Sequence, residues 1–236
     1  MSQELTILAL TALSLGFIHT LLGPDHYLPF IAMSKARKWT FSQTVIVTFA
    51  CGAGHVLSSI LLGLAGISLG FGLGSLETFD SLRGSMAAWM LITFGLLYFI
   101  WGMRRAARSR QHSHWHEHPG GTLHLHGHSH QEEHLHPHRS EKGSLTPWLL
   151  FIIFILGPCE PLIPLLIYPA AMQSLAGVLL VSLLFGIATV VTMLTVVVVS
   201  SYGIGFLPSG RLERYSHSMA GATICLSGVA IRFFGL

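Results

Sequence analysis

Long apolar segments separated by short polar connections dominate the chain. Six such segments can be drawn, at residues 5–33, 42–73, 84–103, 145–169, 174–200 and 214–235. An apolar helix needs roughly 20 residues to cross the hydrocarbon core of a bilayer, and all of these segments reach that length. The pattern therefore predicts an all-α integral membrane protein with six transmembrane helices.

Composition narrows the class of protein further. Hydrophobic residues make up 51% of the 236 residues and charged residues only 10%, against about 25% charged in an ordinary soluble domain. This balance excludes a soluble enzyme, a disordered chain and a small disulfide-stapled secreted domain. The three cysteines, Cys51, Cys159 and Cys225, all lie in apolar segments and predict no disulfide framework. We expect no enzymatic activity and no nucleic-acid partner, because the basic residues flank apolar segments instead of forming a binding face.

Two apolar segments contain glycine and proline where a continuous helix would be interrupted. The first segment has Gly23-Pro24 and later Pro29, and the fourth has Gly157-Pro158, Pro161 and Pro164. Proline removes a backbone donor and clashes with the preceding turn of a helix. We therefore expect both helices to be broken inside the membrane, where freed backbone groups must be covered by protein or line a cavity.

The basic residues predict the orientation of the chain. If both termini lie on one side of the membrane, 11 of the 13 lysines and arginines lie on the other side. The connection before the third segment then carries Glu77, Asp80 and Arg83. The positive-inside rule places the 104–144 loop in the cytoplasm and both termini outside it. We expect a multi-pass protein of the inner (plasma) membrane.

The two halves of the chain share a pattern at an offset of 134 residues. At that offset Leu22-Gly23-Pro24 aligns with Leu156-Gly157-Pro158. Each half has three segments, an odd number, so the halves are expected to lie inverted relative to one another. Inverted repeats with broken helices are typical of secondary transporters, whose site lies near the midplane. The predicted units are a three-helix repeat at 1–104, a His-rich cytoplasmic loop at 105–143 and a second repeat at 144–236.

Few residues with metal-ligating side chains lie inside the apolar segments. A charged group at the centre of a bilayer costs about 2.5–3.5 kcal/mol on insertion scales, so such residues are functional candidates. The offset aligns Asp25-His26 with Cys159-Glu160. Imidazole suits nickel, cobalt, zinc and copper, whereas carboxylate suits harder ions. The predicted ligands of a midplane metal site are His19, Asp25, His26, His55, Cys159 and Glu160.

Each candidate also has a structural interpretation. His55 could hydrogen-bond a neighbouring helix, and Asp25-His26 could be an ion pair that holds the kink, or a proton relay. Cys159 could be a small packed residue, and Arg232 in the last segment could reach the outer membrane interface. The residues alone leave ligand and packing roles open.

A histidine-rich tract separates the third and fourth segments. Residues 112–138 hold 11 of the 15 histidines, mostly at every second position. The tract has no apolar periodicity, so we expect it to be disordered without a ligand. Clustered imidazoles predict metal binding, with a solvated linker or a pH-responsive tract as the alternatives. The predicted auxiliary ligands are His112, His114, His116, His118, His124, His126, His128, His130, His134, His136 and His138.

These motifs resemble those of the nickel/cobalt transporters, in particular the NicO and urease-accessory UreH-type branch. The resemblance rests on H-T-L-L-G-P-D-H at 19–26, G-H-V-L-S-S at 54–59, L-G-P-C-E-P at 156–161 and the central His-rich loop. The branch belongs to a superfamily that includes the TauE-type sulfite exporter and the CcdA/DsbD electron carriers. The family signature is usually H-x4-D-H, whereas this chain has one more residue between His19 and Asp25. Asp25, His26 and His55 match the family's ligands.

The resemblance implies transport of nickel or cobalt by alternating access, with zinc as a further candidate cargo and with no fixed cofactor. It implies membrane lipid, a divalent metal ion, and a cytoplasmic metallochaperone or urease or hydrogenase maturation proteins as partners. Two other functions stay open. An organic or sulfur-oxyanion exporter would hold its anion at helix N-termini, which the acidic Asp25 and Glu160 oppose. A thiol–disulfide electron carrier needs two cysteines that can meet, but the position equivalent to Cys159 is Asp25.

Overall fold

Helices make up almost all of the structure. The computed structural model describes residues 3–70, 73–108, 112–117, 123–128, 145–157, 159, 161–172, 174–205 and 213–235. Within these residues the eight α-helices are α1 (Gln3–Leu22), α2 (Leu28–Arg37), α3 (Phe41–Ser68), α4 (Leu73–Arg108), α5 (Leu145–Leu156), α6 (Leu162–Ala171), α7 (Leu175–Gly205) and α9 (Ser216–Val229). A 3-10 helix, η1 (Pro24–His26), follows α1, and a π-helical turn, η2 (Ala230–Phe234), follows α9. Two strands, β1 (His112–Glu117) and β2 (Leu123–His128), form an antiparallel pair.

The length and polarity of the helices identify a multi-pass integral membrane protein. Among the described residues, five helices are long and apolar enough to cross a membrane, namely Gln3–Leu22, Phe41–Ser68, Gly74–Arg108, Leu175–Ser201 and Ser216–Phe234. Two shorter apolar helices are α5 and α6. Large apolar side chains such as Leu10, Phe49 and Leu183 are exposed on the surface of the bundle, as expected of a face that contacts lipid. The count of six membrane crossings stays a prediction.

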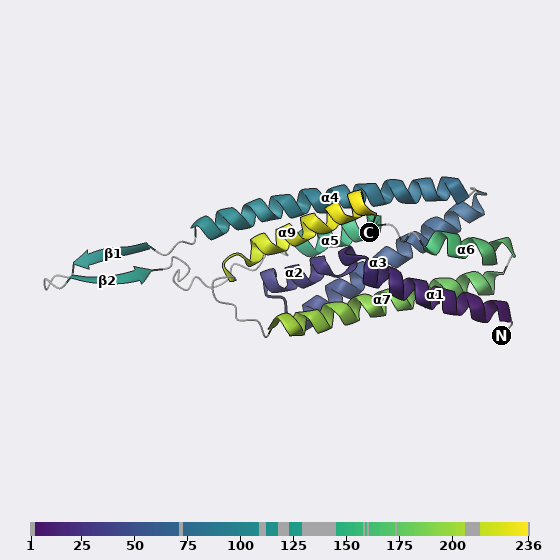
Figure 1. Ribbon diagram of the computed structural model, residues 1–236, viewed down its shortest axis with the longest axis horizontal. Helices are drawn as coiled ribbons and strands as arrows, with labels where there is room; N and C mark the ends of the chain where they lie inside the picture. Colours follow the sequence, from purple (N-terminus) through teal and green to yellow (C-terminus); the bar gives the residue numbers. More distant parts are fainter. Residues whose placement is uncertain are drawn as a thin grey trace.

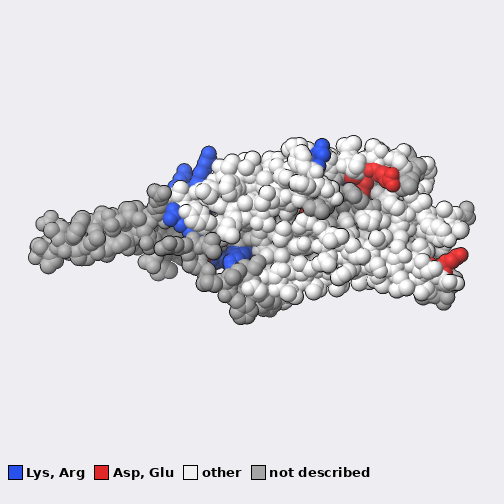
Figure 2. Space-filling view, viewed as in Figure 1, with Lys and Arg blue, Asp and Glu red and all other residues white. Residues whose placement is uncertain are grey.

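The long helices lie side by side along the long axis of the molecule, and the strand pair extends beyond one end (Figure 1). Helix α4 packs along α9, α1 packs along α7, and α3 packs against both α5 and α7. Lysine and arginine side chains gather near the end that carries the strands, whereas acidic side chains lie toward the opposite end (Figure 2). This separation of charge agrees with the positive-inside pattern. The side of the membrane that each end faces stays a prediction.

Helix boundaries recur at a constant interval along the chain. Helices α2 (Leu28–Arg37) and α6 (Leu162–Ala171) begin and end 134 residues apart. Helix α3 begins at Phe41 and α7 at Leu175, again 134 residues apart. The interval is the one at which the sequence halves align, and the inverted arrangement of the halves stays a prediction.

The breaks occur at the Gly-Pro pairs, but not at every proline that was expected to interrupt a helix. Pro29 lies in the first turn of α2, and Pro164 lies in the first turn of α6. A proline there costs no hydrogen bond, because the first backbone N–H groups of a helix have no partner within the helix. The predicted interruptions at Pro29 and Pro164 are therefore wrong. Helix α3 starts cleanly at Thr40, whose side chain forms a capping box with Gln43.

The third apolar segment begins earlier than predicted. Helix α4 begins at Leu73, so Glu77, Asp80 and Arg83 lie in the helix and not in a connection. Asp80 and Arg83 form an ion pair across one helical turn, with Arg83 Nη1 3.1 Å from Asp80 Oδ1. Pairing compensates for part of the cost of removing two charges from water, which allows the helix to continue through them.

Part of the histidine-rich tract is ordered, so the prediction of disorder is wrong for residues 112–117 and 123–128. Strands β1 and β2 pair in a register that places His112 opposite His128, His114 opposite His126 and His116 opposite His124. Alternation with a period of two is the repeat of a β-strand, and the sequence pattern of this tract has that period. His118, His130, His134, His136 and His138 lie outside the described residues.

Two clusters of buried apolar side chains hold the helices together. The first apolar cluster contains Phe30, Cys51 and Leu150 together with Ile224 of α9. The second apolar cluster contains Ala12 of α1, Phe185 of α7, and Cys159, Leu162 and Leu166 around the second break. Both clusters join segments from the two halves of the chain.

Candidate metal site

Three histidines from separate elements converge in the interior of the bundle. His19 lies in the last turn of α1, His26 ends η1 directly after the break, and His55 lies in α3. One ring nitrogen from each histidine lies within 4.8 Å of the nitrogens of the other two. The ring centroids are 4.8 Å apart for His19 and His26 and 5.1 Å apart for His26 and His55. The break at Gly23-Pro24 reverses the chain locally and so brings His26 back beside His19.

The Nε2 atoms of this histidine triad are buried and have no hydrogen-bond partner among the described residues. His26 and His55 are each only 3% exposed. A buried polar atom without a partner costs about 1–3 kcal/mol, and three such atoms in one place need an explanation. A metal ion would accept a lone pair from all three, so this donor set fits a transition-metal ion.

The other ring nitrogens are held by acceptors. His55 Nδ1 lies 3.1 Å from the carbonyl oxygen of Phe154, and His26 Nδ1 lies 3.2 Å from the carbonyl oxygen of Gly23. A carbonyl oxygen accepts but cannot donate, so Nδ1 carries the proton in both rings and Nε2 carries the lone pair. Metal-ligating histidines typically show this arrangement, in which the second nitrogen donates to a carbonyl or carboxylate.

A cavity of about 340 Å³ adjoins the triad. His19, Asp25, His26 and His55 supply its polar wall, and apolar side chains such as Ile153 supply most of the remainder. A cavity of this size can hold an ion together with water, because one water molecule occupies about 30 Å³ of the liquid.

The structure brings together three of the six candidate ligands predicted from the sequence. Asp25 lies beside the triad, with Oδ1 3.2 Å from Nδ1 of His26. It thus contacts a ligand histidine on the side away from the converging nitrogens. Cys159 is fully buried in the second apolar cluster and is not in the group of ligand atoms that the described residues form. Glu160 lies outside the described residues.

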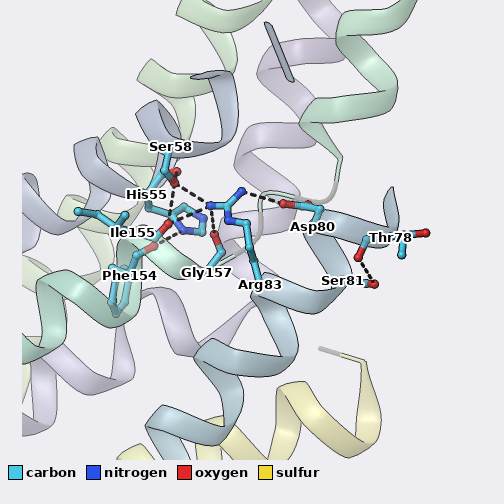
Figure 3. Close-up of polar contacts among 9 residues, drawn as sticks. All are labelled: His55, Ser58, Thr78, Asp80, Ser81, Arg83, Phe154, Ile155 and Gly157. Atoms are coloured by element: carbon cyan, nitrogen blue, oxygen red, sulfur yellow. Dashed lines mark hydrogen bonds and ion pairs between the residues drawn. The ribbon is translucent and has the colours of Figure 1, made fainter. Parts of the chain in front are cut away.

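Sequence reasoning missed the polar contacts that surround His55 (Figure 3). Arg83 Nη2 donates to the carbonyl oxygens of Ile155, at 2.9 Å, and Gly157, at 3.3 Å. It also lies 2.9 Å from Ser58 Oγ. The available signal was the acid–base pair at a spacing of three residues within an apolar stretch, which fits a helix. The backbone carbonyl of Phe154 left no signal in the sequence.

Comparison with known proteins places this site in a family of membrane proteins. A model of the family described as "cytochrome C biogenesis protein transmembrane region" matches residues 27–235. The chain belongs to this family. Searches among curated proteins and among solved structures found no match. Membership confirms the wider superfamily that the sequence motifs indicated, and the nickel/cobalt branch stays a prediction.

Proposed function

We propose that this protein carries a divalent transition-metal ion, nickel or cobalt, across the membrane. The observation that carries the proposal is the histidine triad, with three buried Nε2 atoms that converge and have no partner among the described residues. The ion is the cargo of the protein. Asp25 and the carbonyl of Phe154 orient two of the ligands and do not bind the ion in the conformation described.

The breaks in the first and fourth segments support transport over static metal storage. Helix α1 ends at Leu22 and α2 begins at Leu28, while α5 ends at Leu156 and α6 begins at Leu162. Broken helices next to a midplane site are typical of transporters that expose the site alternately to each side. The constant interval between helix boundaries supports two repeats that move against each other around the triad.

Nitrogen ligands narrow the choice of cargo. Imidazole favours nickel, cobalt, zinc and copper over magnesium and calcium. Three histidines also occur in zinc sites, so zinc is the competing cargo. Affinity rises toward copper in the order of divalent metals, so selection for nickel or cobalt would depend on geometry and availability.

The test is the nickel content of cells that lack their own transporter. Elemental analysis compares the wild-type chain with His26→Gln and His55→Gln at matched expression in the membrane. His217→Gln is the matched control, because His217 contacts Tyr98 and not the triad. Nickel that rises with wild type and His217→Gln, but not with the two triad variants, supports import through the triad.

A fall in nickel with the same dependence on His26 and His55 supports export. Equal nickel contents in all strains remove nickel as the cargo, and the same comparison is then made with cobalt and zinc. Transport of any of the three metals that survives both triad substitutions contradicts the site.

The family description favours one second candidate, a carrier of electrons by thiol–disulfide exchange. That chemistry needs two cysteines whose Cα atoms come within about 7 Å. Cys51 lies in the first apolar cluster, Cys159 lies in the second, and the backbone of Cys225 lies against Gly95 in the contact between α4 and α9. All three are free. These separate surroundings favour metal transport over electron transfer.

A cysteine-free chain distinguishes the two candidates. Replacement of Cys51, Cys159 and Cys225 by alanine should leave metal transport in place, because the proposed ligands are histidines. An electron carrier without cysteines would lose all activity. Loss of metal-dependent accumulation in a cysteine-free protein that is inserted normally contradicts the histidine-only ligand set.

A further inference from the structure

The carboxyl end of α5 lies at the second break, inside the bundle. The last carbonyl groups of a helix have no partner within the helix and must find one elsewhere. The carbonyl of Phe154 accepts from Nδ1 of His55, and the carbonyl of Ile155 lies 2.8 Å from Ser58 Oγ and 2.9 Å from Arg83 Nη2. The carbonyl of Gly157 accepts from the same Arg83 nitrogen (Figure 3). Side chains of α3 and α4 therefore close this helix end.

Arg83 joins three helices through a single guanidinium group. Its side chain is 18% exposed, and it pairs with Asp80, whose side chain is 4% exposed. Burial of two charges is costly even when they are paired. A positive charge at the carboxyl end of a helix returns part of that cost, because the end of the helix carries partial negative charge. The position of Arg83 thus matches the electrostatic requirement of the broken end of α5.

The first break is closed in a different way. The carbonyl of Leu21, at the position that the 134-residue interval relates to Ile155, accepts from the Tyr27 hydroxyl at 3.3 Å. The carbonyl of Gly23 accepts from the backbone N–H of His26, at 3.1 Å. In the described residues, the first break is therefore closed by groups of its own segment. The second break depends on donors from other helices.

We propose that Arg83 is a positioning residue that holds the broken end of α5 against α3 and thereby fixes His55 for metal binding. This inference rests on the proposed function. Arg83 holds the carbonyls of Ile155 and Gly157, and the neighbouring carbonyl of Phe154 holds the ring of His55. Movement of α4 would therefore reach one of the three ligands, while the other two remain on the separately closed first break.

The experiment compares Arg83→Gln and Arg83→Lys with the wild-type full-length protein in detergent. Arg104→Gln is the matched control, because Arg104 lies on the same helix and is exposed. The first measurement is hydrogen–deuterium exchange of residues 150–157 without added metal. The second is titration with Co²⁺ alone, followed by the visible absorption of the bound ion, which reports the geometry of its ligands.

We expect Arg83→Gln to exchange faster in 150–157 and to bind Co²⁺ at least about tenfold more weakly, the lower end of the effect of residues that support metal ligands. Exchange around the first break should not change. Arg83→Lys should lie between wild type and Arg83→Gln, because an ammonium group keeps the charge but lacks the planar fork that reaches several acceptors. Arg104→Gln should match wild type in both measurements.

Each other result has a definite meaning. Unchanged exchange in Arg83→Gln overturns the role of Arg83 in holding α5. Faster exchange with an unchanged Co²⁺ affinity and spectrum overturns its role in positioning His55. If Arg83→Gln does not fold, Arg83→Lys and Ser58→Ala give the same test with smaller perturbations. Failure of the wild-type protein to bind Co²⁺, Ni²⁺ or Zn²⁺ contradicts the proposed function, and the metal-free exchange then still decides whether Arg83 holds α5.

Discussion

Oδ1 of Asp25 lies 3.2 Å from Nδ1 of His26, the same nitrogen that lies 3.2 Å from the carbonyl oxygen of Gly23. Both contacts are acceptors, so Nδ1 keeps its proton and directs the lone pair of Nε2 toward His19 and His55. A carboxylate behind a ligand histidine also makes the ring a stronger base and fixes its orientation. Asp25 therefore acts on the site through His26.

Replacement of Asp25 by asparagine should weaken metal binding. The asparagine side chain would keep an oxygen acceptor for Nδ1 of His26 but remove the negative charge, and loss of such support typically costs about 10–100-fold in metal affinity. Titration calorimetry of the purified protein with Ni²⁺ measures this loss. Glu77→Gln is the control, because Glu77 is an exposed acidic residue of α4. An Asp25→Asn protein that binds Ni²⁺ as tightly as wild type would show that the carboxylate has no part in the site.

Gly23→Ala should displace the ring of His26. A Cβ atom at Gly23 would lie 2.6 Å from His26 Nδ1 and 3.0 Å from Asp25 Oδ1, closer than atoms in contact can approach. The backbone of Gly23, with φ of −85°, suits alanine, so the effect is one of space and not of backbone conformation. We expect the affinity for Co²⁺ to fall at least about tenfold, as for other changes that disturb the support of a ligand.

The control for this variant is Gly74→Ala in α4, where an added Cβ meets nothing within 4 Å. Visible absorption during a Co²⁺ titration measures both proteins. Equal affinity for the two variants would mean that the ring of His26 is not held in the described position when metal binds.

The core of the site could be predicted because its signals are local in the sequence. Gly23-Pro24 marks the break, and His26 and His55 stand out as polar residues within apolar segments. Their burial follows from the apolar surroundings, because no water is available to them at that depth. The role of His19 depended on how far the chain turns at the break, which the motif does not specify.

The remainder of the site could not be predicted from residue types. The carbonyl of Phe154 holds His55, but every residue has a carbonyl, and only the end of a helix makes this one available. Arg83 was assigned to a polar connection because a charge at the margin of an apolar segment usually marks its end. Its burial depends on Asp80 one turn earlier and on the carboxyl end of α5, which lies more than 70 residues away.

Gly221→Ala should destabilise the contact between α4 and α9. A Cβ atom at Gly221 would clash with the backbone nitrogen of Phe99 and would lie 2.7 Å from its Cα. Backbone atoms cannot rotate away as a side chain can, so the helices must separate; overpacking of this kind costs about 1–3 kcal/mol. Small residues permit such close approach of helices in membranes. Thermal unfolding in detergent should show a lower midpoint than wild type.

Gly203→Ala in α7 is the matched control, since an added Cβ there meets nothing within 4 Å. Its unfolding midpoint should stay the same or rise slightly, because alanine favours a helix over glycine by up to about 1 kcal/mol. A midpoint for Gly221→Ala equal to that of Gly203→Ala would mean that α4 and α9 do not pack this closely.

Replacement of residues 112–138 by a Gly/Ser linker of equal length should leave transport but change its dependence on metal concentration. The histidine triad is built from α1, η1 and α3, whereas β1 and β2 extend beyond the bundle (Figure 1). A flexible or hairpin tract rich in histidine raises the local concentration of metal near the bundle without forming part of the triad. We expect a severalfold change in apparent KM for Ni²⁺ and a maximal rate close to that of wild type, measured as ⁶³Ni uptake or efflux in vesicles. A linker variant that is inserted normally but transports nothing would place the histidine tract in the transport path, and a variant with unchanged KM would leave the tract without a role in delivering metal.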